Sequence, residues 1–423
     1  MAAGPLRIVL LTGNSLCHNP RAMKEAAALA RAGYQVDVLG AWLDPELKAR
    51  DECLLKELPF RFTPVVDVAM PGARAALTQL AQRARRKTAQ LAYDLAGVQN
   101  PLQLGVGLGR MLRLALNIPA QLYLAHSEPC LAVARRLLLA GRRVGVDMED
   151  WFSEDLLPEA RRHRPLGLLR SLERELLCQG VHASCPSDAM SGAIAAAYDC
   201  PPPTVVYNAF AWSGRHVGDG ASRDDRRQRD IPSLHWFSTT LGPGRGLEEL
   251  LAAVELVDHD FVLHLRGRPT PGFAEWIRTR VSERWRTRVK LYPLVANDQL
   301  LPCIAEHDIG FAGEQPDCRS RDLTVTNKIL HYLLAGLAVV ASDTKGQREV
   351  AVQAPEAVFL YPAGDVRALA SALDRLLGSR DALAQAKAAA LAAARDIFCW
   401  ERQEPVLLDA IARAIARPER VSR

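Results

Sequence analysis

The feature that most constrains the fold of this chain is an alternation of short apolar runs with longer segments of helical spacing. In the first half, the apolar runs Arg7–Leu11 and Gln35–Leu39 enclose a helical pattern from Pro20 to Ala32 that ends at Gly33. A strand, a turn, a helix and a second strand in this order begin a parallel sheet. Further strand candidates follow at 122–126, 143–146, 182–185 and 204–207. The first half is therefore predicted to be a doubly wound α/β domain.

A polar stretch separates this alternation from a second one. Residues 213–232 are rich in Gly, Asp and Arg and lack apolar periodicity, which is typical of a linker. Six more strand candidates then alternate with helical segments, at 234–238, 261–266, 289–291, 309–311, 338–341 and 358–360. Because 423 residues are too many for one ordinary core, we expect two domains. They are placed at residues 1–210 and 233–398, with a linker at 211–232 and a last helical segment at 399–423.

The composition limits the kinds of partner that the chain is expected to have. A formal charge of +5 over this length is too small to argue for nucleic acid, which requires a strongly basic domain. The nine cysteines contain no C-x-x-C pair, and neither a signal peptide nor an apolar run long enough to span a membrane is found. We therefore expect a cytoplasmic protein without zinc and without disulfides.

A glycine-rich turn in the second half is the first segment that suggests chemistry. The stretch Ser238–Leu247 reads STTLGPGRGL between a predicted strand and a predicted helix. Gly242 and Gly244 would let the backbone approach a ligand, the helix start offers free N–H groups, and Arg245 adds a charged fork that suits phosphate oxygens. The alternative is a tight turn with a solvated arginine.

A second helix start carries Asn327 and Lys328, followed by Gly336 as a stop signal and by an apolar strand. The helix dipole favours an anion at this place, and the lysine supplies a point charge. Taken as structure alone, Asn327 would be a helix cap and Lys328 a surface charge.

The segment 74–87 is basic and partly amphipathic, with four arginines and a lysine among alanines and leucines. Such a helix would contact anionic lipid headgroups and bring a lipid-linked acceptor within reach. It would equally serve as a solvated helix face, because its hydrophobic side is rich in alanine and buries little area.

Several motifs together resemble the retaining GT-B glycosyltransferases that are family-four-like, also called glycosyl transferases group 1. They are the glycine-rich turn through Glu248, the pattern Asn327-Lys328-x-x-x-Tyr332-x-x-Ala335-Gly336-x-x-Val339-Val340-x-Ser342-Asp343, the ending Phe398-x-Trp400-Glu401, and the shorter Asn19-Pro20-Arg21 and Val206-Tyr207-Asn208. They occur in the family's order over nearly the whole chain. The resemblance implies a GT-B fold, two facing Rossmann-like domains, with the C-terminal helix crossing back towards the N-terminal domain.

By this resemblance the second half holds the donor, a nucleotide-diphosphate sugar. Arg245 and Lys328 would bind its phosphates, and Gly13 in the first half would leave room for donor and acceptor. The family's second glutamate, which usually holds the ribose, aligns with His331, and the first falls at or near Leu323. Asp322, Asp317 and Glu314 are the nearest carboxylates, and we rank Glu314 first because it closely follows a predicted strand.

The acceptor side is expected in the first half, where Asp147, Glu149 and Asp150 follow a predicted strand. Relatives often carry His where Glu149 stands. Acids here would hold sugar hydroxyls through strong hydrogen bonds, or else would form a solvated acidic helix start. His18, in the loop after the first strand, and His126, after a strand end, are further candidates for this side.

The resemblance implies a hexosyltransferase-like, retaining and metal-independent enzyme. Arg245 and Lys328 would stabilise the leaving diphosphate, so no metal and no cofactor is expected. The acceptor would be a carbohydrate or a lipid-linked glycan in polysaccharide assembly. Because Leu323 and His331 replace the glutamates, a catalytically degenerate GT-B subunit is the alternative, and a nucleotide-sugar epimerase is a third.

Overall fold

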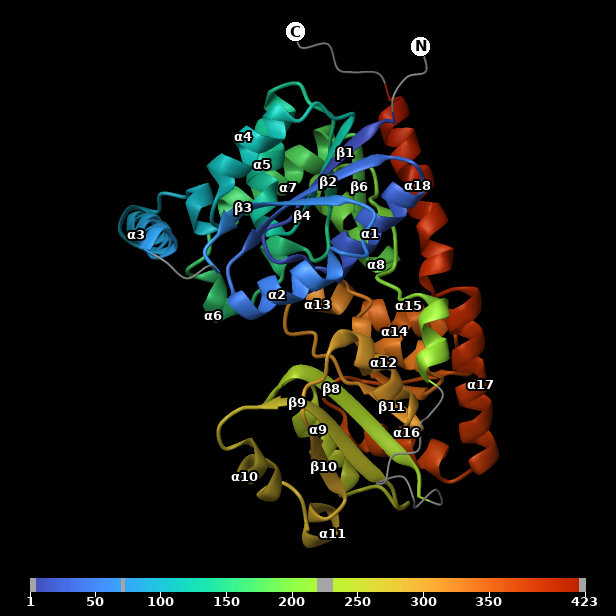
Figure 1. The fold of residues 1–423 in the computed structure, drawn as a ribbon. Coiled ribbons are helices and arrows are strands. Elements are labelled where there is room, and N and C mark those ends of the chain that lie inside the picture. The colour runs from blue at the N-terminus through green and yellow to red at the C-terminus, as the bar shows by residue number, and fades with distance from the viewer. Residues whose placement is uncertain (1–4, 70–72, 219–230, 418–423) are drawn as a thin grey trace. The chain divides into compact units, whose positions relative to one another are not determined.

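The computed structural model describes residues 5–69, 73–218 and 231–417, and the chain divides into two compact units. The N-terminal unit comprises Met1–Pro186, Met190–Val206 and Glu404–Arg423, and the C-terminal unit comprises Ser187–Ala189 and Tyr207–Gln403. Each unit contains one parallel sheet with helices around it (Figure 1). The α/β class and the two doubly wound sheets expected from the sequence are confirmed. Much of the predicted linker, at 219–230, lies outside the described residues.

The sheet of the N-terminal unit has seven parallel strands in the order β3-β2-β1-β4-β5-β6-β7. The strands are β1 (Arg7–Leu11), β2 (Gln35–Trp42), β3 (Arg61–Asp67), β4 (Leu122–His126), β5 (Val144–Asp147), β6 (His182–Cys185) and β7 (Thr204–Val205). The strand order reverses between β1 and β4, so the crevice beyond their carboxyl ends is where a ligand is expected in such a sheet.

Eight α-helices connect the strands of this unit. They are α1 (Pro20–Arg31), α2 (Pro45–Leu54), α3 (Ala73–Ala96), α4 (Leu108–Asn117), α5 (Glu128–Leu139), α6 (Pro158–Arg161), α7 (Leu166–Gln179) and α8 (Asp188–Tyr198). The start of α1 shows why the chain becomes helical there. The Asn19 side chain accepts a hydrogen bond from the Ala22 amide at 2.9 Å, and Pro20 occupies the first helical position.

The strand β3 is missing from the sequence prediction. Its apolar run is interrupted by Pro64, and a proline inside a run argues against a strand in the middle of a sheet. The structure places β3 at the edge, where it pairs only with β2 and shifts register between Gly40 and Ala41. An edge strand tolerates a proline because one of its sides needs no ladder hydrogen bonds.

The sheet of the C-terminal unit has six parallel strands in the order β10-β9-β8-β11-β12-β13. The strands are β8 (Ser233–Leu241), β9 (Val262–Pro269), β10 (Val289–Tyr292), β11 (Ile309–Ala312), β12 (Ala338–Ser342) and β13 (Val358–Tyr361). The order reverses between β8 and β11, which gives this unit its own crevice at a topological switch point. Its core includes the fully buried Trp236 and Trp285.

The helices of the C-terminal unit complete both faces of this sheet. They are α9 (Leu247–Val254), α10 (Phe273–Arg278), α11 (Glu283–Arg286), α12 (Asn297–Ala305), α13 (Arg319–Leu323), α14 (Asn327–Ala335), α15 (Lys345–Gln353), α16 (Val366–Leu377) and α17 (Arg380–Asp396). The glycine stop after α14 is as expected, since Gly336 is left-handed with φ +77°. Among the described helices, none combines the length and the apolar character that a membrane crossing requires.

The last helix, α18 (Trp400–Ala416), belongs to both units. It begins in the C-terminal unit, and from Glu404 onward it is part of the N-terminal unit. Leu407 and Ile411 on this part are fully buried, and Glu404 pairs with Arg31 of α1 at 3.0 Å. The part of α18 from Glu404 onward thus completes the packing of the unit that contains the first strand.

Candidate functional site

The glycine-rich turn of the C-terminal unit follows β8 and leads into α9. Gly244, Arg245 and Gly246 have φ angles of 91°, 58° and 79°, so three successive residues are left-handed. Such a conformation is uncommon for a residue other than glycine, which makes Arg245 a strained position. At Gly246 a Cβ atom would lie 2.2 Å from the carbonyl oxygen of Gly313, so the loop after β8 and the loop after β11 touch through their backbones.

Arg245 lies exposed at the tip of this turn. Its Nη1 donates a hydrogen bond to the buried hydroxyl of Ser238, on β8. The Gly244 amide donates to a carboxylate oxygen of Glu248 at 2.6 Å, so an acidic side chain already occupies an anion position at the helix start. The turn therefore presents the Arg245 cation at its tip, with Gly242 before it, while the Gly244 amide already has Glu248 as its acceptor.

Lys328 and Glu314 form the second part of this site. Lys328 is the second residue of α14, Glu314 comes two residues after β11, and the two side chains form an ion pair that is only 12% and 14% exposed. The backbone of Glu314 is fixed because its carbonyl accepts a hydrogen bond from the Ser342 hydroxyl at 2.5 Å. The lysine ammonium also lies 5.7 Å from the centre of the Trp236 ring. Lys328 is therefore a half-buried, neutralised cation and not a solvated surface charge.

Asn327 and His331 line the first turn of α14. Asn327 is not the cap: Thr326 holds that position, and the Asn327 side-chain oxygen accepts a hydrogen bond from Asn208 at 2.9 Å. His331 Nδ1 contacts the Asn327 carbonyl oxygen at 2.8 Å, which makes Nδ1 the protonated nitrogen. The centre of its ring lies 3.6 Å from that of Phe210, a contact that was not predicted.

The position that the resemblance assigns to the first glutamate cannot hold a sugar. Leu323 ends the short helix α13 and is 3% exposed, and its carbonyl accepts a hydrogen bond from Ser187 at 2.5 Å. Of the nearby acids, Asp322 pairs with Lys345 at 2.9 Å and Asp317 lies 3.4 Å from Arg321. Only Glu314 lies beside a predicted phosphate ligand, Lys328.

In the N-terminal unit, the loop after β1 packs tightly against α5. The Gly13 amide donates to the Ser127 hydroxyl at 2.9 Å, and a Cβ atom on Gly13 would lie 3.0 Å from Cγ of Pro129. The glycine is thus required by protein packing, whatever space it leaves for a ligand. His18 ends a short 3-10 helix (Leu16–His18) in the same loop and is exposed.

The acidic segment after β5 divides into a buried and an accessible part. Asp147 is 2% exposed, and its Oδ2 lies 2.7 Å from Nε of Arg21, so the alternative of a solvated acidic helix start is wrong for this residue. The side chain of Glu149 is 20% exposed and accepts a hydrogen bond from Asn19 at 2.6 Å. Asp150 is half-buried. Glu149 is therefore the acid of this segment that is both accessible and held in place by Asn19, from the loop after β1.

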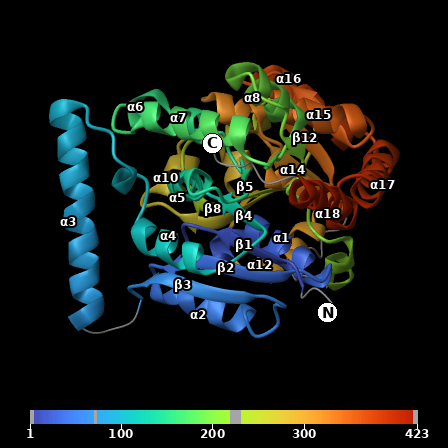
Figure 2. The same cartoon turned by 90° about the horizontal axis from the view of Figure 1, so that it is seen from above.

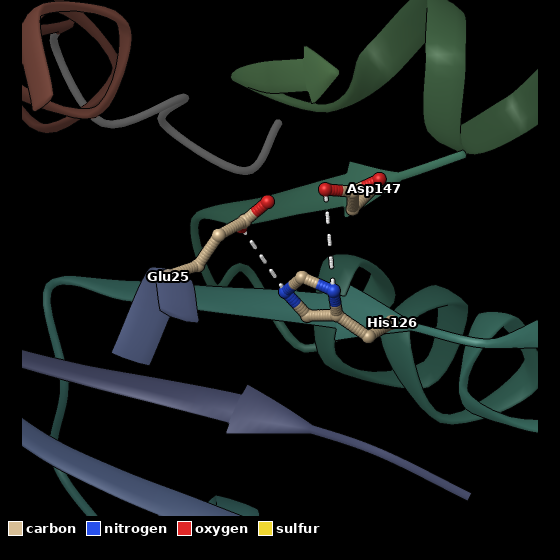
Figure 3. Close-up of side chains that lie close together, drawn as sticks. All are labelled: Glu25, His126 and Asp147. Atoms are coloured by element: carbon tan, nitrogen blue, oxygen red, sulfur yellow. Dashed lines mark ion pairs between the residues drawn. The ribbon is translucent and has the colours of Figure 1, made fainter. Parts of the chain in front are cut away.

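A network of buried charges supports Glu149, and sequence reasoning missed it. His126, at the end of β4, lies 3.2 Å from Glu149 through Nδ1 and 3.4 Å from Glu25 through Nε2. Figure 3 shows the imidazole of His126 between the carboxylates of Glu25 and Asp147. Arg21 completes the network, 3.4 Å from Glu25. One clue in the sequence is that Arg21 and Glu25 are charged residues on the otherwise alanine-rich buried face of α1.

The network fixes the protonation of its members. Burial alone would lower the pKa of His126, but the carboxylates of Glu25, Glu149 and Asp147 raise it to about 9. Burial would raise the pKa of Asp147, but Arg21 and His126 lower it to about 2. Burial and the Asp147 carboxylate raise the pKa of Glu25 well above its usual range. At neutral pH an imidazolium thus donates to Glu149 and holds that carboxylate in place.

Glu25, His126 and Asp147 also form the one group among the described residues whose donor atoms lie close enough together to hold a metal ion. The guanidinium of Arg21 already lies 2.7 Å from Asp147 and 3.4 Å from Glu25. A metal ion would have to displace this cation from both carboxylates and remove the proton from His126. The donor set therefore fits an ion network better than a metal site.

Two parallel doubly wound sheets, each with polar side chains at its own switch point, define the GT-B fold of glycosyltransferases. Residues 234–379 match the model of the family Glycosyl transferases group 1, so the C-terminal unit contains the domain of this family. The fold expected from the sequence is confirmed, and the match over residues 234–379 agrees with the expected family. No curated protein matches the chain in sequence.

Several solved structures share the fold over almost their full length. HepE of Anabaena, in complex with UDP, is 18% identical with a TM-score of 0.67, and the match covers 96% of this chain and 100% of HepE. Sucrose-phosphate synthase of Thermosynechococcus elongatus is 14% identical with a TM-score of 0.69, over 96% and 98% of the two chains. A glycosyltransferase of Rickettsia africae is 11% identical with a TM-score of 0.65, over 98% and 100%.

Proposed function

We propose that this chain is a retaining glycosyltransferase that uses a nucleotide-diphosphate sugar as donor. The observation that carries the proposal is the pair of cations at the switch point of the C-terminal sheet, Arg245 and Lys328. Arg245 precedes Gly246, which touches Gly313 on the loop after β11, and Lys328 pairs with Glu314 on that same loop; each cation lies at the start of a helix. A helix start and a cation together suit a diphosphate.

In the proposed reaction the bond between the donor sugar and the diphosphate breaks, and the diphosphate leaves with the electron pair. A hydroxyl oxygen of the acceptor forms the new bond to the same sugar carbon, and its proton passes to an oxygen of the leaving phosphate. Arg245 and Lys328 stabilise the negative charge that develops on the leaving phosphate, each through charge-assisted hydrogen bonds of about 1.5–3 kcal/mol. Glu314 lies next to Lys328 and is the acid that meets the sugar. Glu149, held by His126 and Asn19, binds the acceptor. No metal and no cofactor is part of this proposal.

The acceptor is proposed to be a carbohydrate or a lipid-linked glycan, and the place of action the cytoplasmic face of a membrane. Among possible donors, UDP-sugars come first, because HepE has been solved with UDP and with UDP-glucose. His331 would replace the usual glutamate at the ribose, with Phe210 fixing its ring.

Thermal shift with UDP, GDP and ADP tests the donor site. A ligand at 100 times its dissociation constant should stabilise the protein by about 2.7 kcal/mol. Arg245→Ala and Lys328→Ala should each weaken binding about 10- to 100-fold, which corresponds to the loss of one charge-assisted bond. Arg286→Ala, an exposed arginine on α11, is the control and should bind as the wild type does. Equal affinity in all three variants would refute the site.

Transfer and binding should separate at Glu149. Glu149→Gln should lower the rate of transfer at least about tenfold, because the acceptor loses a charged hydrogen-bond partner, while the affinity for the nucleotide stays the same. Glu159→Gln, an exposed acid on α6, is the matched control. If Glu149→Gln weakens nucleotide binding as much as transfer, the residue does not act on the acceptor.

A catalytically degenerate subunit is the second candidate, and the buried Leu323 is the observation in its favour. The two functions differ in one readout: an enzyme slowly hydrolyses the matching sugar nucleotide, whereas a degenerate subunit only binds it. A nucleotide-sugar epimerase, the third candidate, would instead convert the sugar nucleotide to its isomer without any acceptor.

A further inference from the structure

The helix α3 is the surface element that the proposed function leaves unexplained. It is a long helix at the outer edge of the N-terminal unit (Figure 2). Its inner face is held to the unit at two points, since Gln79 donates to the Val68 carbonyl at 2.9 Å and the Tyr93 hydroxyl donates to the Arg164 carbonyl at 3.0 Å. Ala89, on the same inner face, is buried.

The outer face of α3 carries a stripe of exposed leucines. The exposed fractions are 65% for Leu77, 65% for Leu80, 53% for Leu91 and 82% for Leu95. With 3.6 residues per turn, these four positions fall on one side of the helix. The hydrophobic side of this helix was expected to be rich in alanine. In the structure, Ala89 faces the unit and the leucines face outward. The leucines form two exposed pairs on this side, Leu77 with Leu80 and Leu91 with Leu95, and exposed apolar side chains gathered on one face of a helix mark an interaction site.

Arg83 and Lys87 lie on one side of these leucines and Arg85 on the other, whereas Arg86 lies on the inner face near Gln79. Arg83, Arg85, Arg86 and Lys87 are all exposed, and no ion pair within the described residues involves them. The whole helix has five basic residues against a single acidic one, Asp94.

Two cavities beneath the helix continue the basic border. A cavity of about 400 Å³ lies against β3 and α4, and three arginines line it: Arg85, Arg110 and Arg113. A smaller cavity of about 190 Å³ is lined by Arg83 and Arg86, together with apolar side chains. These arginines lie on the inner side of the helix and add to the positive charge of this edge of the unit, which attracts an anionic surface.

We propose that the outer face of α3 docks on the surface of an anionic lipid bilayer, with Leu77, Leu80, Leu91 and Leu95 inserted among the acyl chains near the headgroups. The basic residues beside them pair with lipid phosphates. An amphipathic helix with leucines on one face and Lys and Arg flanking them binds a membrane interface in this way.

A second copy of the chain fits this face less well. In a helix pair with the seam 77, 80, 84, 87, 91 and 94, the charged Lys87 and Asp94 would lie in the apolar seam. The basic borders of two such helices would also repel each other, whereas an anionic lipid surface neutralises them.

Sedimentation of the full chain with lipid vesicles tests this proposal. The protein should pellet with vesicles in which a third of the phosphatidylcholine is replaced by phosphatidylglycerol, and not with phosphatidylcholine alone. Changing the four leucines together to glutamine should reduce the fraction bound more than about tenfold. Changing the four basic residues 83, 85, 86 and 87 to glutamine should do the same, and high salt should weaken wild-type binding.

Matched variants elsewhere control for the loss of apolar surface and of charge. The apolar control changes four exposed residues to glutamine: Leu139, Leu256, Leu294 and Val352. The charge control changes four exposed basic residues to glutamine: Arg136, Arg286, Lys290 and Arg367. Both controls should bind the anionic vesicles as the wild type does.

The proposal is overturned if the wild type does not pellet with anionic vesicles or if the leucine variant binds them equally well. It is also overturned if the wild type forms a dimer that the leucine changes abolish while no vesicle binding is found. Because the leucines lie outside the donor site, the thermal shift by a nucleoside diphosphate should be unchanged in every variant of α3. Failure of membrane docking is thus distinguishable from failure of the proposed glycosyl transfer.

Discussion

At the scale of single residues, the ion pair of Lys328 with Glu314 influences how strongly the proposed donor site binds a diphosphate. A diphosphate must compete with the Glu314 carboxylate for the lysine, and both side chains are more than four-fifths buried. We therefore expect the carboxylate to lower the affinity for the anion and, in the proposed function, to lie beside the sugar once the donor has bound. Glu314 is therefore expected to reduce the affinity for the diphosphate and to provide a polar contact to the donor sugar.

Glu314→Gln should consequently bind the nucleoside diphosphate more tightly and transfer sugar more slowly. Removing one largely buried charge beside the phosphate should raise the affinity by roughly 5- to 30-fold, or about 1–2 kcal/mol. Calorimetric titration with UDP measures the affinity, and initial rates measure transfer. Asp317→Asn, an exposed acid in the same loop region, is the control. Weaker binding in the Gln variant would show that Glu314 supports the phosphate site.

At the scale of elements, the turn between β8 and α9 depends on glycine for two separate reasons. Gly246 precedes α9 with φ +79°, and Gly272 precedes α10 with φ +78°. The two backbones are alike, but a Cβ on Gly246 would meet Gly313 at 2.2 Å, whereas nothing lies within 4 Å of a Cβ on Gly272. Comparing alanine substitutions at Gly246 and Gly272 therefore separates the free energy lost through the left-handed backbone from that lost by forcing the two loops apart.

Gly272→Ala should lose about 1 kcal/mol of unfolding free energy, the cost of a left-handed alanine, and keep its nucleotide affinity. Gly246→Ala carries the same cost plus that of the clash, and should lose more than about 2 kcal/mol in total. It should also bind the diphosphate more weakly, because Arg245 moves away from Lys328. Chemical denaturation and titration with UDP measure the two effects. Equal behaviour of the two variants would contradict the close contact of the loops.

The elements also show which parts of the site could be predicted from the sequence. Arg245 and Lys328 lie in local patterns, a glycine turn and a helix start, whose function depends on neighbours in sequence. The network of Arg21, Glu25 and His126 with Asp147 joins positions that are more than a hundred residues apart. Nothing in the local spacing connects them, because the strand order of the sheet brings them together.

At the scale of the whole molecule, the two doubly wound sheets followed from apolar periodicity, and the exception has a physical reason. The strand β3 was missed because Pro64 breaks its run, and only its edge position makes the proline acceptable. The unit boundaries differ from a division at consecutive residues, since Glu404 and the residues after it belong to the N-terminal unit. The apolar pattern of a helix that packs in both units does not show to which unit each part of it belongs.

Ile411→Ala tests this assignment. The side chain is fully buried on the part of α18 that belongs to the N-terminal unit, so the change should cost about 2–5 kcal/mol. Hydrogen exchange should show the loss of protection in β1 to β7 and little change in β8 to β13. Val406→Ala, at a position that is 40% exposed on the same helix, should have a small effect. Loss of protection confined to β8 to β13 would contradict the assignment.

The passage of α18 between the units has a consequence for the order in which the chain folds during synthesis. The C-terminal unit is nearly continuous in sequence, from Tyr207 to Gln403, and its packing partners leave the ribosome together. The N-terminal unit leaves the ribosome first, but Arg31 on α1 pairs with Glu404, which is synthesised 373 residues later. The core of the N-terminal unit therefore stays incomplete while the other unit is synthesised. The surface that α18 later covers is exposed during this time, and we expect a chaperone to bind there.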